Sequence, residues 1–158
     1  MVKHRRVVLE RKYTAAEGAN YILVFEDEIE GWRSASVDVV VSLLEPHEVH
    51  ELELESECEV CIRAGLAFIS LPIPDRGVPA SLAKTRLLVA SCSEQLNAGN
   101  NIVVHCRAGI GRSSMIAACV LVAAGLRPNV AFERIAMARG QPVPDTPAQT
   151  EWVDAFTP

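Results

Sequence analysis

Short apolar runs alternate with longer amphipathic segments along most of the chain. The runs at 37–44, 66–71 and 102–105 are rich in Val, Ile and Leu and have the length of buried strands. The segments that follow them are long enough for helices and have Pro, Gly or Asn near their ends. This alternation predicts an α/β fold, with a central, mostly parallel sheet flanked by helices on both faces.

The positions of Pro, Gly and other turn residues indicate where the helices begin and end. Pro46 can occupy the first turn of a helix that runs to Gly65 and exposes its glutamates, including Glu48 and Glu57. The dense turn residues at 72–79 predict a loop. Two short apolar stretches, 7–9 and 21–25, are candidate strands of the same sheet. Further helices are expected over 80–97, 112–124, 129–139 and 146–156.

Length and charge limit the class of protein. The 158 residues fit one domain spanning 1–158, with 49% hydrophobic residues available for a core. A net charge of −5 argues against binding to nucleic acid or to an anionic membrane. The longest apolar run has 12 residues, whereas a membrane helix needs about 20. With no signal-peptide pattern and an odd number of cysteines, we expect a cytoplasmic monomer with free thiols.

One segment combines a strand, a glycine-containing loop and a helix, in the order in which α/β proteins build ligand sites. It reads His-Cys-Arg-Ala-Gly-Ile-Gly-Arg-Ser over residues 105–113. Gly109 and Gly111 permit close approach of the backbone to a ligand. The amides of Arg107, Ala108, Gly109, Ile110, Gly111 and Arg112 can therefore form an anion-binding nest at the start of a helix. The planar guanidinium of Arg112 can bind two further oxygens of a tetrahedral anion.

Cys106 lies at the base of this predicted nest. The amides and the helix end that attract an anion also favour the thiolate form of a cysteine, which is the nucleophilic form. We expect His105 to orient the loop, and Ser113 to donate a hydrogen bond to the Cys106 sulfur when that sulfur is a leaving group. Cys106 is thus the candidate nucleophile, whereas a free cysteine without such a loop is usually inert.

The pattern His-Cys-x-x-Gly-x-x-Arg-Ser resembles the signature loop of the cysteine-based protein tyrosine phosphatases. The resemblance covers roughly 37–149 and is strongest to the small dual-specificity branch, such as the kinase-associated phosphatases. It implies a phosphoprotein phosphatase that acts on phosphotyrosine through a phosphocysteine intermediate, with phosphoserine and phosphothreonine as further candidate substrates. It further implies a phosphorylated protein or peptide as substrate, with no metal and no cofactor.

The resemblance also assigns residues outside the loop. Pro72-Ile73-Pro74-Asp75 is similar to the acid loop of the family, which makes Asp75 the general acid of the first step and the base of the second. Asp75 could instead simply form a turn. Gln149 matches one glutamine of the family's water-positioning segment, but Thr146 and Gln149 also have the spacing of a helix capping box.

Some features depart from the family or suggest other chemistry. Ile73 stands where classical members have Trp, and the loop lacks the extra lysines of lipid-directed members. A rhodanese-like sulfurtransferase and a non-catalytic phosphate-binding module remain alternative functions. Cys58 and Cys61 have the spacing of a redox or metal pair, but no second pair accompanies them. The remaining candidates are read as structural residues: His47 and His50 on a solvated face, and Cys92 and Cys119 in the core.

Overall fold

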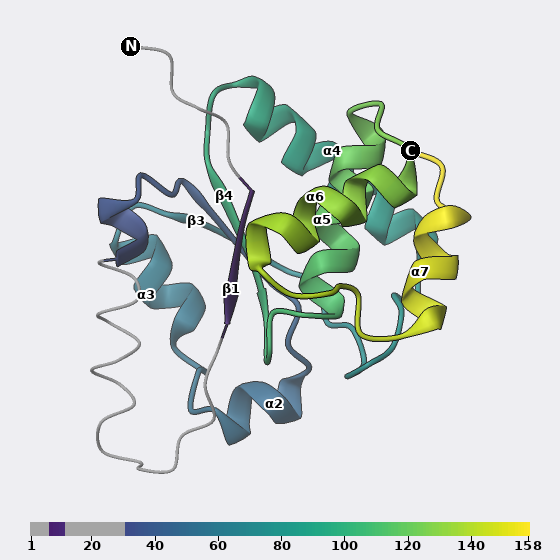
Figure 1. Cartoon of the computed structure of the whole chain (residues 1–158). Coiled ribbons are helices and arrows are strands. Elements are labelled where there is room, and N and C mark those ends of the chain that lie inside the picture. Colours follow the sequence, from purple (N-terminus) through teal and green to yellow (C-terminus); the bar gives the residue numbers. More distant parts are fainter. Residues whose placement is uncertain (1–6, 12–30) are drawn as a thin grey trace.

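In the part of the chain that the structure describes, four parallel strands form the central sheet (Figure 1). The computed structural model describes residues 7–11 and 31–158, so the candidate strand at 21–25 lies outside the described residues. The strand order is β1-β4-β2-β3. The expected α/β class and the strand near residue 7 are confirmed. The strands are β1 (Val7–Arg11), β2 (Val39–Ser42), β3 (Ala67–Ser70) and β4 (Ile102–Cys106).

Strand β4 lies between β1 and β2 and carries the candidate nucleophile at its end. Ile102 pairs with Val7 on one side and with Val39 on the other. Every residue of β4 is buried, as expected for a central strand of β-branched and apolar residues. Because all strands run in the same direction, their carboxyl ends meet at one edge of the sheet. Cys106 is the last residue of β4 and lies at that edge.

Helices cover both faces of the sheet (Figure 1). On one face, Val39, Val41 and Val104 pack in a core with side chains of α4, α5, α6 and α7. On the other face, Val40 and Val103 pack with Trp32, with α3 and with the chain around α2. The helices are α2 (Pro46–Glu51), α3 (Glu57–Arg63), α4 (Leu82–Asn97), α5 (Arg112–Ala123), α6 (Pro128–Arg139) and α7 (Pro147–Asp154).

The prediction of a single helix from Pro46 to Gly65 is wrong, because this segment forms two helices, α2 and α3. Leu52 and Leu54 are both buried in the same core, at 2% and 3% exposure. In a continuous helix these two side chains would point about 200° apart, so only one of them could face the sheet. A turn between the helices, with Glu53 at φ 54°, lets both leucines pack inward.

The solvated glutamate face expected for this segment is also partly wrong. Glu48 and Glu57 are only 1% and 2% exposed. A carboxylate is buried only when a partner compensates its lost hydration. The partners lie in the predicted anion loop and are described below.

Cys92 and Cys119 have the core environment that was expected of them. Cys92 and Cys119 lie in the core, where burial raises their pKa to about 11 and about 12. Cys58 is exposed and Cys61 buried, and both are free thiols. His50 contacts Glu55 on the surface. Over residues 7–11 and 31–158, no three metal-binding side chains gather in one group, and no helix has the length and apolarity to span a bilayer.

Candidate active site

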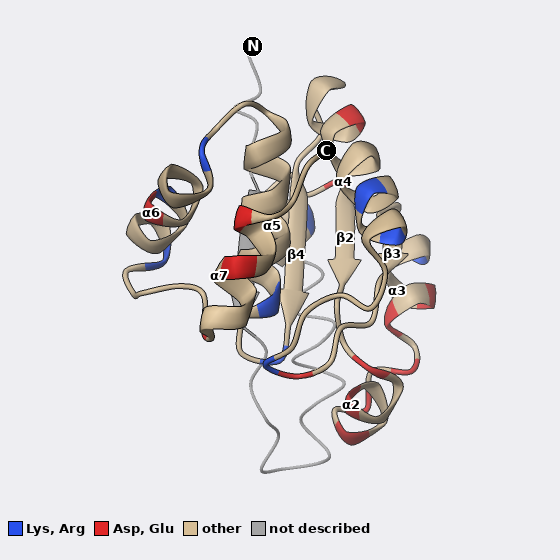
Figure 2. Cartoon of the chain, turned by 90° about the vertical axis from the view of Figure 1, so that its right-hand side faces the viewer, with Lys and Arg blue, Asp and Glu red and all other residues tan. Residues whose placement is uncertain are grey.

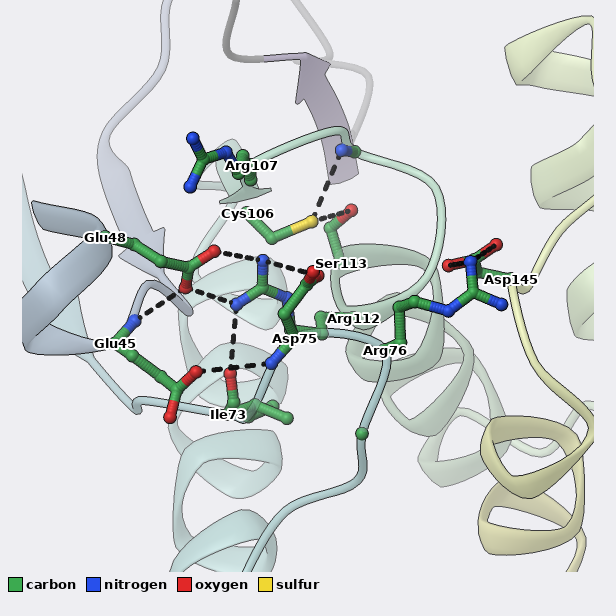
Figure 3. Close-up of polar contacts among 12 residues, drawn as sticks. Glu45, Glu48, Ile73, Asp75, Arg76, Cys106, Arg107, Arg112, Ser113 and Asp145 are labelled. Carbon is green, nitrogen blue, oxygen red and sulfur yellow. Dashed lines mark hydrogen bonds and ion pairs between the residues drawn. The ribbon is translucent and has the colours of Figure 1, made fainter. Parts of the chain in front are cut away.

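The sulfur of Cys106 lies at the centre of the loop that joins β4 to α5 (Figure 3). The Gly109 amide donates a hydrogen bond to Sγ over 3.3 Å, and Ser113 Oγ lies 3.5 Å from Sγ. Gly109 has φ 68°, a conformation that favours glycine. Cys106 is only 2% exposed. The loop therefore surrounds the sulfur with hydrogen-bonding groups that stabilise negative charge.

A small cavity of about 50 Å³ opens above this sulfur. Its lining comes from the loop and the start of α5, and from two other segments, the 72–79 loop and the residues before α7. The cavity is lined by Cys106, Ala108, Ile110, Gly111, Arg112, Asp75, Arg76 and Asp145. The structure therefore brings the predicted nucleophile, the predicted anion-binding arginine and the predicted acid to one place.

Arg112 is anchored beneath the cavity by Glu48 of α2 (Figure 3). Its Nη1 and Nη2 atoms donate to the two carboxylate oxygens of Glu48 over 2.6 and 2.8 Å. Nη1 also donates to the Ile73 carbonyl over 3.0 Å. This two-pronged contact fixes the plane of the guanidinium, which a single point contact could not do.

The two charges stabilise each other although both are buried. Burial alone would raise the pKa of Glu48, but hydrogen bonds from Arg112 and from the Glu45 amide outweigh it, so this pKa is lowered. Burial alone would lower the pKa of Arg112, but its hydrogen bond to Glu48 and the charges of Cys106, Glu48 and Asp75 raise it. Glu48 thus holds a permanent positive charge next to the sulfur.

Asp75 lies at the mouth of the cavity, on the loop between β3 and α4. Its Oδ1 atom is 3.3 Å from Arg112 Nη2, and its amide donates to Glu45 Oε2 over 3.3 Å. The Asp75 side chain is 63% exposed. This position suits a group that must meet both solvent and a bound ligand.

His105 is buried behind the loop, next to Cys106. Its Nε2 atom lies 2.8 Å from Glu57 Oε1, and both side chains are almost fully buried. The ring of Trp32 stacks on the imidazole at a centroid distance of 6.1 Å. These contacts orient His105 on the side of β4 away from the cavity, so His105 takes no part in lining it.

Gln149 makes the contacts of a helix cap. Its backbone amide and side chain complete a reciprocal capping box with Thr146 at the start of α7. Its Nε2 atom also donates to the Gly77 carbonyl over 3.1 Å. Gln149 lies against the anion loop, because a Cβ added to Gly111 would come within 2.8 Å of its Oε1. Gly111 is therefore the residue that lets Gln149 pack there.

Arg107 points away from the cavity. Its Nη1 atom bonds Glu51 of α2 over 2.8 Å, and this hydrogen bond raises the pKa of Arg107. Its side chain is not among the groups that line the cavity. Only its backbone remains a candidate for phosphate binding.

Sequence reasoning missed the buried carboxylates that support the site. Glu48 and Glu57 were expected in solvent, yet they hold Arg112 and His105. A signal for Glu48 was present: Glu45 and Glu48 are three residues apart around Pro46, the spacing of a capping box, and this box forms at α2. No comparable local signal marks Glu57, because its partner is 48 residues away.

Comparison with known proteins identifies the family. A family model described as "Polymorphic toxin system, DSP-PTPase phosphatase" matches residues 18–126, a range that contains Asp75, Cys106 and Arg112. The chain belongs to this family of dual-specificity-type protein tyrosine phosphatases. No curated protein sequence matches the chain.

Several solved phosphatase structures have the same fold. The kinase-associated phosphatase, in a form with its catalytic cysteine replaced by serine, is 19% identical, with a TM-score of 0.74 over 83% of this chain and 74% of that one. The active form of Tk-PTP is 24% identical, with a TM-score of 0.70 over 84% and 87%. PTPMT1 in complex with PI(5)P is 25% identical, with a TM-score of 0.71 over 97% and 92%. These similarities confirm the dual-specificity phosphatase fold.

Proposed function

We propose that this chain hydrolyses phosphate monoesters on proteins through a phosphocysteine intermediate at Cys106. Phosphotyrosine is the expected substrate, with phosphoserine and phosphothreonine as further candidates. Membership of the phosphatase family supports the reaction class. The observation that carries the mechanism is the convergence of Cys106, Arg112 and Asp75 on one small cavity.

In the first step the Cys106 thiolate attacks phosphorus. An S–P bond forms while the bond from phosphorus to the substrate oxygen breaks. The loop amides and Arg112, held by Glu48, bind the three other phosphate oxygens as charge builds on them. Asp75 donates its proton to the departing oxygen, so that a neutral alcohol or phenol leaves.

In the second step water hydrolyses the phosphocysteine. The Asp75 carboxylate accepts a proton from the water as its oxygen attacks phosphorus, and the S–P bond breaks. Ser113 Oγ, 3.5 Å from the sulfur, donates a hydrogen bond to the departing thiolate. The products are inorganic phosphate and the starting enzyme, and no step requires a metal or a cofactor.

The charges around the cavity support a protein substrate. Acidic residues gather on α2 and α3 (Figure 2), and Glu51 neutralises Arg107. A polyanionic headgroup, nucleic acid or an anionic membrane would meet repulsion there. PTPMT1 was solved with PI(5)P, but the loop of this chain has no additional free cation directed at its cavity in the described structure. A single domain over 1–158, a monomeric state and a cytoplasmic location stay predictions.

Trapping the intermediate tests the proposal. The chain is mixed with an aryl phosphate in the presence of a metal chelator and quenched in acid, and its peptides are analysed by mass spectrometry. We expect turnover in chelator and a phosphoryl group on the peptide that contains Cys106. Turnover with the label on another residue, or turnover abolished by chelator, would contradict the mechanism. Persulfide on Cys106 after thiosulfate treatment, without phosphatase activity, would instead support a sulfurtransferase, and tight phosphopeptide binding without turnover a binding module.

Asp75→Asn should slow the first step according to the leaving group. Because the amide cannot donate a proton as an acid does, kcat/KM for phenyl phosphate should fall by about 10²–10⁴-fold. The fall should be much smaller for an aryl phosphate whose phenol is already acidic. The measurement is kcat/KM across a series of aryl phosphates. An equal loss for all members of the series would remove Asp75 from the role of general acid.

A further inference from the structure

The turn that carries Asp75 has an unusual residue at its third position. The Gly77 amide donates to the Pro74 carbonyl over 2.8 Å and closes a turn over residues 74–77. Arg76, the third residue of this turn, has φ 56°. Turns with this geometry favour Gly or Asn at that position, because a Cβ is disfavoured in the left-handed region. A strained residue that persists beside a catalytic group indicates that its side chain has a function there.

The side chain of Arg76 reaches the segment before α7. Its Nη1 atom lies 3.3 Å from Asp145 Oδ2 and donates to Oδ1 over 3.5 Å (Figure 3). The start of α7 makes two more contacts with the turn: Thr146 Oγ1 donates to the Arg76 carbonyl over 3.5 Å, and Gln149 Nε2 donates to the Gly77 carbonyl. The turn is therefore attached to the start of α7 by one ion pair and two hydrogen bonds.

Asp75 itself is held more loosely. Its side chain is 63% exposed, and its Oδ1 atom contacts Arg112 Nη2 over 3.3 Å. A bound phosphate must compete for that contact, because Arg112 is also the residue expected to bind the phosphate. Once the phosphate occupies Arg112, the position of the Asp75 carboxyl depends on the backbone of its turn.

We propose that Arg76 and Asp145 form a clamp that holds the Asp75 turn over the Cys106 cavity. Both line the cavity, together with Asp75 and the loop that surrounds the sulfur. In this proposal they are positioning residues, which act on the reaction only through the placement of Asp75. The inference rests on the proposed role of Asp75 as general acid and names the residues that make that role effective.

The clamp has a kinetic signature. A displaced Asp75 donates its proton less well, and the loss matters most when the departing oxygen is strongly basic. Removing the clamp should therefore reduce kcat/KM by a factor that grows with the pKa of the leaving phenol. A residue that only supported the fold would lower the rate for all substrates alike, or would lower the amount of folded protein.

Arg76→Gly tests the clamp without an expected loss of stability. It removes the guanidinium, and glycine relieves the strain of the left-handed conformation. We expect its Tm to equal or exceed that of the wild type. For phenyl phosphate we expect kcat/KM to fall by about three- to tenfold, in keeping with the modest strength of an exposed ion pair, with a smaller fall for activated aryl phosphates. Asp145→Asn should give the same profile. The double variant should lose no more than either single variant, because both changes remove one interaction.

A matched control is Arg86→Gln, which also removes an exposed arginine that bonds a distant part of the chain, Thr157, but is not among the residues that line the cavity. Its leaving-group profile should coincide with that of the wild type. The clamp is refuted if Arg76→Gly shows no dependence on the leaving group, or if the effects of the two single variants multiply. Asp75→Asn shows which proposal has failed. If its loss of kcat/KM is also independent of the leaving group, the proposed general acid is wrong. If its loss does depend on the leaving group, only the clamp is wrong.

Discussion

Replacing Cys106 by serine is expected to lower kcat/KM by about 10⁴-fold or more, a loss typical of a missing covalent nucleophile. The loop is built to stabilise a charged sulfur through the Gly109 amide and Ser113. A serine hydroxyl stays protonated at neutral pH. Because the loop amides and Arg112 remain in place, the variant should still bind phosphopeptides.

The measurement pairs steady-state kinetics with calorimetric binding of a phosphopeptide. Cys58→Ser is the matched control, because Cys58 is an exposed free thiol on α3, distant in sequence from the loop. It should leave both quantities unchanged. Undiminished hydrolysis by Cys106→Ser would rule out the phosphocysteine mechanism.

Glu48→Ala should have the largest effect on stability. It removes one partner of a buried ion pair and leaves the Arg112 guanidinium, which is 2% exposed, without its carboxylate. Breaking such a pair typically costs about 3–5 kcal/mol in the free energy of unfolding. Activity should fall by about 10²-fold as well, because Arg112 loses the contact that fixes its plane.

Urea unfolding and kcat/KM measure the two effects. Glu51→Ala is a suitable control, because it removes a carboxylate of the same helix from an exposed pair with Arg107. Its cost should be about 1 kcal/mol or less. If the alanine variant of Glu48 does not fold, Glu48→Gln keeps the shape and removes the charge. Stability losses of similar size for Glu48 and Glu51 would contradict the proposed anchoring of Arg112.

The same pair predicts an acid-sensitive part of the stability. The pKa of Glu48 is lowered from its ordinary 4.5 in the folded protein. Its contribution is therefore present above about pH 4.5, where the carboxylate is ionised in both states, and is lost as the pH falls through the folded value. Glu48→Gln should lose less stability than the wild type as the pH falls below about 4.5. Parallel curves would contradict this assignment.

The sheet and most helices could be predicted because their signals are local. β-Branched runs mark β2 and β4, and Pro or Gly lies near the ends of α6 and α7. The prediction that the glutamates after Pro46 are all exposed was wrong, because these glutamates look alike in the sequence. Which of them is buried depends on Arg112 and His105, which approach only after the chain has folded.

In the candidate site too, the residues that are close in sequence could be predicted, whereas the contacts between distant segments could not. Cys106, Arg112 and Ser113 belong to one continuous loop, so their spacing alone places them together. The role of Asp75 as general acid was predicted only from a family resemblance, since a lone Asp near Pro and Gly usually indicates only a turn. The pairing of Arg76 with Asp145 joins two segments 69 residues apart, and neither residue has a pattern that predicts it.

The strand order has a consequence for how the protein is made. The central strand β4 pairs with β1 and β2, both of which leave the ribosome much earlier, with Val7 finally opposite Ile102. Until β4 arrives, these early strands cannot complete the sheet, and such distant pairing slows folding. Open strand edges in the nascent chain also invite aggregation. The nucleophile, at the end of the last strand, therefore enters its site only when the sheet closes.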